Sequence, residues 1–337
     1  MSTSFSSLPI VSLSTLSSSS SSLDALEALS LRLDEVFSTT GFAYLTDLPL
    51  TYSHDDVFGL CDDFFGHNGL SEESKMKLAK KSFVKNNKNT YRGYFPPQAG
   101  ADNLKEGFEI GSPSTRSEVR LDTVKFNLTE PNVFPSSNSS FRTRCETLHA
   151  ELQTLSAKLL SVLATSLGKL PSFFEHYLED SLSTLRLLHY PPVPAERQQD
   201  LICTPHTDSG ILTLLHQDKT GGLEVRNSDG EWIPAPYVPG SMVVNIGDLM
   251  AKVSEGRWIA TYHRVRSMNR EGGVRSQGRY SIPFFFEPGM DCVVQSVEGR
   301  ECVYGEHVLE KMKGWVEFQD VVKVPEESAG RIAVEAF

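Results

Sequence analysis

The sequence predicts an α+β protein with a mainly β core, in which N-terminal helices flank a double-stranded β-helix, or jelly roll. Two observations support this class. In the first half, apolar residues recur every three or four positions over long segments, which is the period of an amphipathic helix. After about residue 180 the chain changes to short β-branched or aromatic runs separated by turn residues, as in an antiparallel sandwich or barrel. We expect the two halves to share one core.

Residues 1–22 include twelve serines and are expected to form a partly disordered leader. One apolar piece, residues 8–13, interrupts the serines and can pair as an edge strand. A strand is also expected over residues 41–45, and residues 72–92 are typical of a helix end that runs into a loop. Between these segments a helix is predicted, because its apolar positions fall on one stripe: Leu26, Leu29, Leu33, Val36 and Phe37.

The longest helix is predicted between Phe141 and Leu167, from apolar positions at helical spacing: Phe141, Cys145, Leu148, Leu152, Leu155, Leu159 and Val162. Strands are predicted over residues 182–190, 211–215, 222–225, 241–246, 261–265 and 280–286. The expected organisation is a leader at 1–22, a helical and mixed region at 8–175, a jelly-roll core at 180–320 and a tail at 321–337. We expect these parts to fold as one cooperative unit.

The composition excludes several classes of function. The chain of 337 residues has 32 Lys and Arg against 43 Asp and Glu, a net charge of −11, and no long basic run. This balance argues against nucleic acid or an anionic membrane as a partner. No stretch has the roughly 18 apolar residues of a membrane span. The five cysteines form no CxxC pair, which disfavours a disulfide framework and favours a reducing compartment, with the cytoplasm as the expected location.

Histidine and aspartate two residues apart on a strand point to the same side of it, which is one way to begin a metal site. This pattern occurs three times. His54 lies in turn-like sequence and is expected to cap the following helix. Asp218, after His216, runs into a turn. The third pair, His206 and Asp208, opens the strand-rich half and precedes an apolar strand.

The third pair is distinguished by polar residues further along the chain. His263 lies in a strand pattern 55 residues after Asp208, and Arg279 and Ser281 share a strand face a little beyond it. Two histidines and one carboxylate leave three coordination positions open, as in non-haem Fe(II) sites that bind a bidentate co-substrate and O₂. An arginine fork beside a hydroxyl suits a carboxylate. The alternatives are core histidines with a capping aspartate, and a strand salt bridge with a solvated serine.

These residues belong to an ordered series of motifs that covers roughly residues 8 to 320. The series consists of Leu8-Pro9-Ile10-Val11, Gly41-Phe42-Ala43-Tyr44, Tyr91-Arg92-Gly93-Tyr94, Lys105-Glu106-Gly107-Phe108-Glu109, Leu185-Arg186-Leu187-Leu188-His189-Tyr190-Pro191, His206 with Asp208, Gly221-Gly222-Leu223-Glu224-Val225, Val244-Asn245-Ile246-Gly247-Asp248, His263-Arg264-Val265 and Arg279-Tyr280-Ser281. In this series the chain resembles the Fe(II)/2-oxoglutarate-dependent dioxygenases of the isopenicillin-N-synthase-like type. The segment 185–191 resembles microbial members, including fungal thymine hydroxylases.

The resemblance implies a role for each matching residue. His206, Asp208 and His263 would be the iron ligands and hence the catalytic centre. Arg279 and Ser281 would hold the distal carboxylate of 2-oxoglutarate. Tyr190 would add a hydroxyl to that contact, the alternative being a core aromatic residue. The implied reaction consumes 2-oxoglutarate and O₂, releases succinate and CO₂, and oxidises a C–H bond of a small organic molecule.

The sequence departs from the family pattern at two positions. Leu188 stands where plant members usually carry asparagine. Ser209 follows the His-x-Asp motif, where the thymine hydroxylases have an aromatic residue, and this argues against pyrimidine stacking there. The stretch between His263 and Arg279 is longer and more polar than usual and is expected to be a surface loop.

Candidates for the substrate pocket are less specific. Arg186 faces either the site or water, and it shares strand parity with Tyr190, so the two are expected to point the same way. Further candidates are Tyr91, Arg92, Phe284 and Phe286, although aromatic residues in such runs also form cores. Asn245 and Asp248 are interpreted as turn residues. The loops that select the substrate are expected in segments 72–115, 193–203 and 250–260.

The leading hypothesis is an oxygenase of secondary metabolism, with hydroxylation as the default outcome. Asp208 keeps a carboxylate on the iron, which argues against a halogenase. Desaturation, cyclisation and ring expansion stay open, because they differ only in the fate of the substrate radical. A non-catalytic jelly roll that binds metal or a small ligand is the alternative from another class. The sequence specifies neither the substrate nor the oligomeric state.

Overall fold

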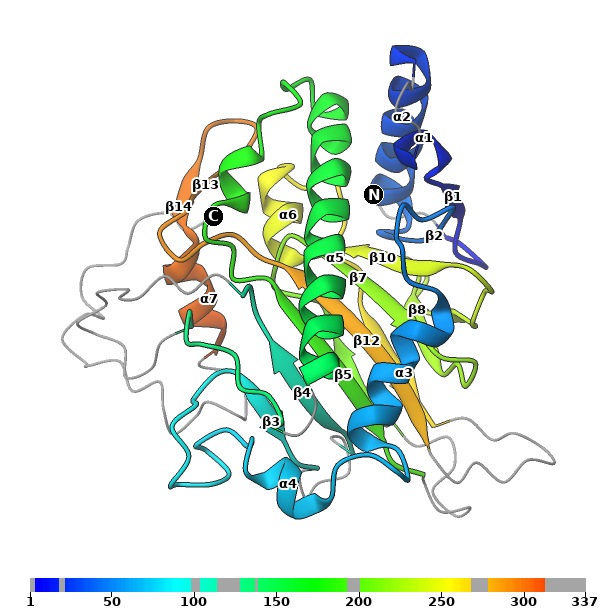
Figure 1. Cartoon of the computed structure of the whole chain (residues 1–337). Coiled ribbons are helices and arrows are strands. Elements are labelled where there is room, and N and C mark those ends of the chain that lie inside the picture. Colours follow the sequence, from blue (N-terminus) through cyan, green and yellow to red (C-terminus); the bar gives the residue numbers. More distant parts are fainter. Residues whose placement is uncertain are drawn as a thin grey trace.

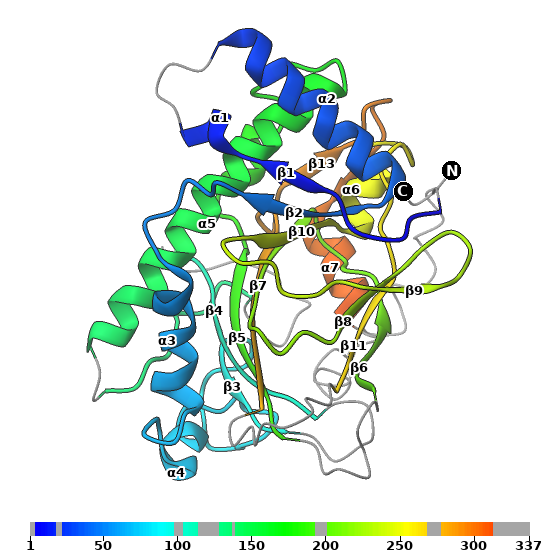
Figure 2. The ribbon, with the colours of Figure 1, turned by 90° about the vertical axis from the view of Figure 1, so that its right-hand side faces the viewer.

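Two β-sheets face each other in the computed structural model, and helices cover the outer face of the larger sheet (Figure 1, Figure 2). The structure describes residues 4–17, 22–97, 104–113, 128–136, 139–192, 201–267 and 278–312. The helices are α1 (Ser14–Ser17), α2 (Leu23–Thr39), α3 (His54–Phe65), α4 (Glu72–Met76), α5 (Ser139–Ser166), η1 (Glu175–Leu178), α6 (Asp248–Val253) and α7 (Tyr304–Met312).

The larger sheet has eight strands in the order β1-β2-β10-β7-β12-β5-β4-β3. Its neighbours are antiparallel, except that β1 runs parallel to β2 at one edge. The strands are β1 (Ile10–Ser12), β2 (Phe42–Thr46), β3 (Gly93–Phe95), β4 (Glu106–Ile110), β5 (Thr184–Tyr190), β7 (Leu212–Gln217), β10 (Met242–Ile246) and β12 (Arg279–Phe286).

The smaller sheet has four antiparallel strands in the order β6-β11-β8-β9 and lies on the side of the large sheet away from α5 (Figure 2). Its strands are β6 (Leu201–His206), β8 (Leu223–Arg226), β9 (Trp232–Pro234) and β11 (His263–Arg266). A separate hairpin of β13 (Val293–Gln295) and β14 (Glu301–Val303) contacts α7. The two facing sheets form the jelly roll that the sequence predicts.

Alternation of side chains along the strands produces two apolar layers. In β5, Leu185 and Leu187 belong to the core between the large sheet and the helices. Leu188 and Tyr190, on the opposite face, belong to a second cluster between the two sheets. The interior of the jelly roll is therefore lined by one parity of each strand, and this parity decides which residues can reach the site.

Helix α5 confirms the predicted apolar stripe, because all seven predicted positions are buried. Helix α2 packs against α5 near the β1–β2 edge of the larger sheet (Figure 1). The last residue of the serine run, Ser22, caps α2 by accepting a hydrogen bond from the backbone N–H of Ala25 at 3.2 Å. In the part of the chain that the structure describes, no helix is long and apolar enough to cross a membrane.

The six predicted strands of the second half are confirmed as β5, β7, β8, β10, β11 and β12, with ends shifted by up to two residues. The leader contains the predicted edge strand β1, and it also contains the short helix α1, which was not predicted. Predictions for the serines at 18–21, for segment 193–200, for the loop at 268–277 and for the tail at 321–337 lie outside the described residues. The division into one cooperative unit stays a prediction.

Strand β4 is the main element that the sequence reading missed, since segment 72–115 was interpreted as a substrate loop. Its sequence lacks an apolar alternation, because two of its buried residues are glutamates that pair with lysines. Glu106 accepts a hydrogen bond from Lys75 at 2.6 Å, and Glu109 forms an ion pair with the fully buried Lys80. Strand β6 and helix α6 likewise begin within or beside segments that were interpreted as loops.

Candidate active site

The predicted metal ligands converge at one end of the smaller sheet. His206 is the last residue of β6 and His263 is the first residue of β11, and the two are paired directly across these strands. Asp208 lies two residues after His206, in the connection from β6 to β7. One possible ligand atom from each side chain lies within 4.8 Å of the other two. Antiparallel pairing thus joins His206 and His263, which are 57 positions apart in the sequence.

Hydrogen bonds orient both imidazole rings. Nδ1 of His206 lies 2.8 Å from the carbonyl oxygen of Thr204, and Nδ1 of His263 lies 3.3 Å from that of Thr261. A carbonyl oxygen only accepts, so Nδ1 donates, and Nε2 of the neutral ring keeps its lone pair. Burial lowers the pKa of His263 to about 4, which keeps that ring neutral. Both Nε2 atoms face Oδ1 of Asp208, at 3.9 and 3.8 Å.

The carboxylate of Asp208 is held by its other oxygen. The hydroxyl of Thr213 donates to Oδ2 at 2.6 Å, and the side-chain amide of Asn245 donates to the same atom at 2.8 Å. Burial alone would raise the pKa of Asp208, but the two imidazoles and these hydrogen bonds bring it below its usual value. Oδ1 is thereby left as the oxygen that faces the histidines. Asn245 lies in β10 and not in a turn, which corrects its interpretation from the sequence.

We expect Asn245→Ala to lower the affinity for Fe(II) about tenfold, because an outer contact that orients a ligating carboxylate is lost. Anaerobic titration of the purified protein with Fe(II) measures this. Thr213→Ser, which keeps the hydroxyl, is the matched control and should bind Fe(II) like the parent. An Asn245→Ala protein with unchanged Fe(II) affinity would show that the hydrogen bond does not orient Asp208 for the metal.

A second polar group lies inside the jelly roll on β12 and β5. Arg279 pairs with Tyr190 across these strands, and its guanidinium lies 5.0 Å from the centre of the tyrosine ring. Nε of Arg279 donates to the carbonyl oxygen of Gly221 at 2.9 Å, while Nη1 is buried without a hydrogen-bond partner among the described residues. Ser281, on the same face of β12, is also buried. The structure thus brings the three predicted co-substrate residues together.

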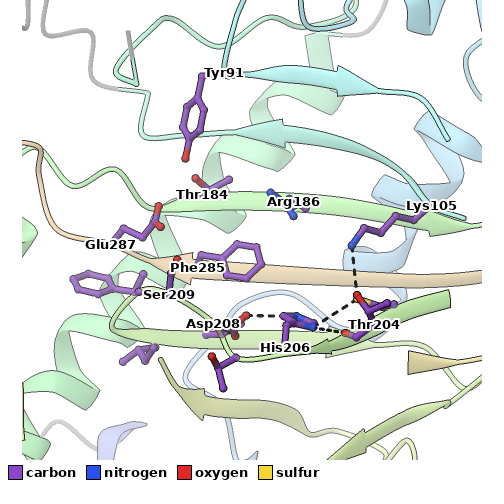
Figure 3. A pocket seen from close by; sticks show the side chains of 16 residues that line it. Tyr91, Lys105, Thr184, Arg186, Thr204, His206, Asp208, Ser209, Phe285 and Glu287 are labelled. Carbon is purple, nitrogen blue, oxygen red and sulfur yellow. Dashed lines mark hydrogen bonds and ion pairs between the residues drawn. The ribbon is translucent and has the colours of Figure 1, made fainter. Parts of the chain in front are cut away.

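A cavity of about 460 Å³ lies against the metal-ligand group (Figure 3). Strands β5 and β12 form its far wall, with Thr184, Arg186 and Phe285, and His206 and Asp208 lie on the opposite side. This volume is in the usual range for a small-molecule site. The lining residues are Tyr91, Lys105, Thr184, Arg186, Cys203, Thr204, His206, Thr207, Asp208, Ser209, Gly210, Leu212, Thr213, Phe285, Phe286 and Glu287.

The five predicted substrate residues divide between the cavity and the core. Tyr91 and Arg186 line the cavity. Phe286 lines it as well, but its side chain is fully buried in the core under the helices. Arg92 lies behind the wall, where it donates to Thr184 Oγ1 at 2.6 Å and to the carbonyl oxygen of Leu182 at 3.1 Å. Phe284 is fully buried against His149 of α5.

The placement of Phe284 has a simple physical cause. Arg279, Ser281 and Phe285 share one parity of β12 and face the interior, whereas Phe284 shares the opposite parity with Ile282 and faces the helices. The structure thus places Phe284 in the core and not among the residues that line this cavity. The same alternation would have identified Phe285, and Glu287 just after the strand, as cavity-lining residues on the interior side.

We expect Phe284→Leu to reduce the free energy of unfolding by about 1 kcal/mol, because it leaves a small gap in a packed core. The same change should leave 2-oxoglutarate turnover unaffected. Denaturant unfolding and succinate formation measure the two effects. Phe285→Leu is the matched control, because it alters the cavity wall and not the core. If Phe284→Leu lost 2-oxoglutarate turnover while its stability was unchanged, Phe284 would have to be assigned to the active site.

Other cavity residues could not be found from the sequence. Lys105 belongs to one motif of the ordered series, but it was not assigned to the pocket, and Thr184, which begins β5, stands in no motif of that series. Of the two remaining His-x-Asp pairs, His54 begins α3, whose cap is the preceding Ser53, and Asp218 accepts from the backbone N–H of Thr220 in a turn. The turn interpretation of Asp218 is confirmed, whereas the cap of α3 is Ser53 and not His54, which is the first residue of the helix.

Comparison with known proteins agrees with this geometry. The profile of the 2OG-Fe(II) oxygenase superfamily matches residues 181–288, and that of the non-haem dioxygenase in morphine synthesis N-terminal region matches residues 8–137. A 2-oxoglutarate-dependent dioxygenase of Didymella fabae is 33% identical over 75% of this chain and 77% of its own length. A homoarginine-6-hydroxylase of Oryza sativa is 30% identical over 93% of this chain and 98% of its own.

The solved structures show the same fold. A Neurospora crassa protein in complex with alpha-KG superposes with a TM-score of 0.77 at 24% identity, over 90% of this chain and 95% of its own. The same protein has been solved with alpha-KG and thymine. The two profiles match successive parts of the chain, and one relative aligns over nearly its full length. The similarity therefore covers both the helical half and the jelly roll. The chain is thus a member of the 2OG-Fe(II) oxygenase superfamily, a 2-oxoglutarate-dependent dioxygenase that acts on a small molecule.

Proposed function

We propose that this dioxygenase hydroxylates its small-molecule substrate at a centre in which His206, Asp208 and His263 hold Fe(II). The observation that carries the proposal is the convergence of three ligand atoms within 4.8 Å of one another beside a cavity. Two imidazole nitrogens and one carboxylate oxygen match the donor set of non-haem Fe(II) sites that keep open positions. When bound, Fe(II) with 2-oxoglutarate and O₂ supplies the oxidation of an unactivated C–H bond, with release of succinate and CO₂.

The side chains of the chain prepare this centre. The carbonyl oxygens of Thr204 and Thr261 each accept a hydrogen bond from Nδ1, so that Nε2 of the neutral ring would carry the lone pair for the metal. Asn245 and Thr213 hold Oδ2 of Asp208, which leaves Oδ1 for the metal. Asp208 would then offer the metal one oxygen, Oδ1, and the remaining positions would be available to a co-substrate.

Arg279, Ser281 and Tyr190 are suited to the distal carboxylate of 2-oxoglutarate. The buried Nη1 of Arg279 has no partner in the described part of the chain, and a carboxylate would accept its hydrogen bond. The ring of Tyr190 and the carbonyl oxygen of Gly221 hold the guanidinium in place. Ser281, two residues along the same strand face, adds a hydroxyl. A buried cation at this point is stabilised by an anionic ligand, which supports the assignment.

The cavity supports a small organic substrate. Phe285 and Leu212 contribute apolar surface to its lining, beside the polar groups of His206 and Asp208. Hydroxylation as the outcome is supported by the relatives whose names state it, the homoarginine-6-hydroxylases of Oryza sativa, Glycine max and Arabidopsis thaliana. Desaturation and cyclisation would use the same residues and differ in the product.

The proposed function is tested with protein that is purified anaerobically and loaded with Fe(II). Adding 2-oxoglutarate should produce a visible charge-transfer band, and admitting air should convert 2-oxoglutarate to succinate. A substrate should gain one oxygen atom, whereas desaturation or cyclisation would remove two hydrogens. The absence of both the band and succinate would overturn the enzymatic assignment and favour a metal-binding jelly roll without turnover.

A further inference from the structure

Arg186 occupies a prepared position in the wall of the cavity. It lies on the interior face of β5, two residues from Leu188 and four from Tyr190, as the strand parity predicts. Its guanidinium contacts two aromatic rings, 5.6 Å from the centre of Phe95 and 5.2 Å from that of Phe285. Cation–π contacts with two rings restrict the side chain, so its charge is held at a defined place on the wall.

Arg186 is also held by a buried acid on the neighbouring strand β4. Glu109 lies opposite Arg186 on β4 and forms an ion pair with it. The same carboxylate pairs with Lys80, whose side chain is only 1% exposed. One carboxylate is thus shared by two cations, and Arg92 acts on it as well. Glu109 therefore lies among several cations, and an anionic ligand on the cavity side of Arg186 would add negative charge to this cationic part of the wall.

The side of Arg186 that faces the cavity is accessible. Its side chain is 22% exposed, against 3% for Glu109, and it is one of the cavity-lining residues (Figure 3). Lys105 adds a second cation to the lining. Glu287 is an acid of the same wall, and burial raises its pKa to about 7, so it opposes an anion less than an ordinary glutamate would. Apolar surface from Phe285 lies next to the guanidinium.

We propose that the substrate is an organic acid whose carboxylate is bound by Arg186 while its carbon skeleton lies along Phe285 towards the metal ligands. This inference rests on the proposed function, since it concerns the same cavity. A planar guanidinium matches a carboxylate with two parallel N–H bonds, which a lysine cannot reproduce. The carboxylate fixes one end of the molecule and thereby selects which C–H bond faces His206 and Asp208 across the cavity.

Matched pairs of probes test the charge requirement. Benzoate, phenylacetate, 3-phenylpropanoate and hexanoate are each compared with the corresponding carboxamide, using anaerobic enzyme saturated with Fe(II) and 2-oxoglutarate. Calorimetry measures binding, and stimulation of succinate formation in air measures coupling. We expect at least one acid to bind about tenfold or more tightly than its amide, because a charged hydrogen bond is replaced by a neutral one.

Variants connect this preference to Arg186. Arg186→Gln should abolish the preference for the acid over the amide. Arg186→Lys should retain part of this preference, because lysine keeps the positive charge but cannot donate two parallel N–H bonds to the carboxylate. Arg144→Gln removes an arginine that pairs with Asp63 on the surface of α5 and α3 and should keep the preference in full. Thermal unfolding identifies a variant that fails to fold, in which case Arg186→Lys decides.

Two results would overturn the proposal. One is an equal response to acids and amides, including no response to either. The other is an acid preference that survives in a folded Arg186→Gln protein. The charge-transfer band of Fe(II) with 2-oxoglutarate is measured in every variant. A band that persists while the acid preference is missing refutes the substrate class alone, whereas a missing band in the parent refutes the proposed function.

Discussion

Replacing His263 by alanine is expected to abolish iron-dependent turnover while the protein still folds. The change removes one of three proposed metal ligands, so the loss should exceed the roughly 10- to 100-fold that outer contacts of a ligand are worth. His263 is the first residue of β11, and the centre of its ring lies 5.3 Å from that of Phe42 in an edge-on contact. Alanine therefore leaves a gap at the end of the jelly roll but does not interrupt a strand. Succinate formation, Fe(II) content and the charge-transfer band measure the effect.

His54→Ala is the matched control for this prediction, because His54 belongs to another His-x-Asp pair and begins α3. It should retain Fe(II) and turnover. The assignment of the ligands would be contradicted if a folded His263→Ala protein bound Fe(II) and produced succinate like the parent. It would equally be contradicted if His54→Ala lost the metal.

Replacing Arg279 by glutamine is expected to raise the KM for 2-oxoglutarate about 100-fold. Removing one partner of a buried charged hydrogen-bond pair costs about 2–5 kcal/mol, and 100-fold corresponds to about 2.7 kcal/mol. Arg279 is only 4% exposed, and its guanidinium is already fixed by Gly221 and Tyr190, so little of its binding energy is spent on ordering. Succinate formation at graded 2-oxoglutarate concentrations gives KM, and titration of the charge-transfer band gives Kd.

Two further variants separate the anchor from general effects of arginine loss. Ser281→Ala should raise the KM by a smaller factor, on the order of tenfold, because it removes one neutral donor. Arg226→Gln changes an exposed arginine of β8 and should leave the KM unchanged. An Arg279→Gln protein with the parental KM and Kd for 2-oxoglutarate would contradict the assignment of the anchor.

The sequence alone indicated the architecture and the polar residues of the centre. The pattern of each segment predicted its own secondary structure. The helical spacing from Phe141 to Val162 corresponds to α5, and the short apolar runs after residue 180 correspond to the jelly-roll strands. The parity of β5 correctly placed Arg186 on the same side as Tyr190. The ordered motifs that end in Arg279 and Ser281 named the residues that the fold brings together.

The alternation of side chains along a strand also distinguishes neighbouring aromatic residues. Applied to β12 from Arg279, it separates Phe285, which lines the cavity, from Phe284, which packs on α5. The information was present in the sequence, but aromatic residues at neighbouring positions look alike until one strand face is assigned to the interior.

Other features depended on how distant segments meet. Asn245 holds Asp208 because β10 lies beside β7 in the large sheet, and Glu109 holds Arg186 because β4 pairs with β5 in one particular register. Strand β4 itself was missed, because its glutamates look like surface residues until Lys75 and Lys80 are found beside them. Periodicity reports which way a side chain points within its own segment. The partner that it meets there is set by strand register and packing, which only the folded chain provides.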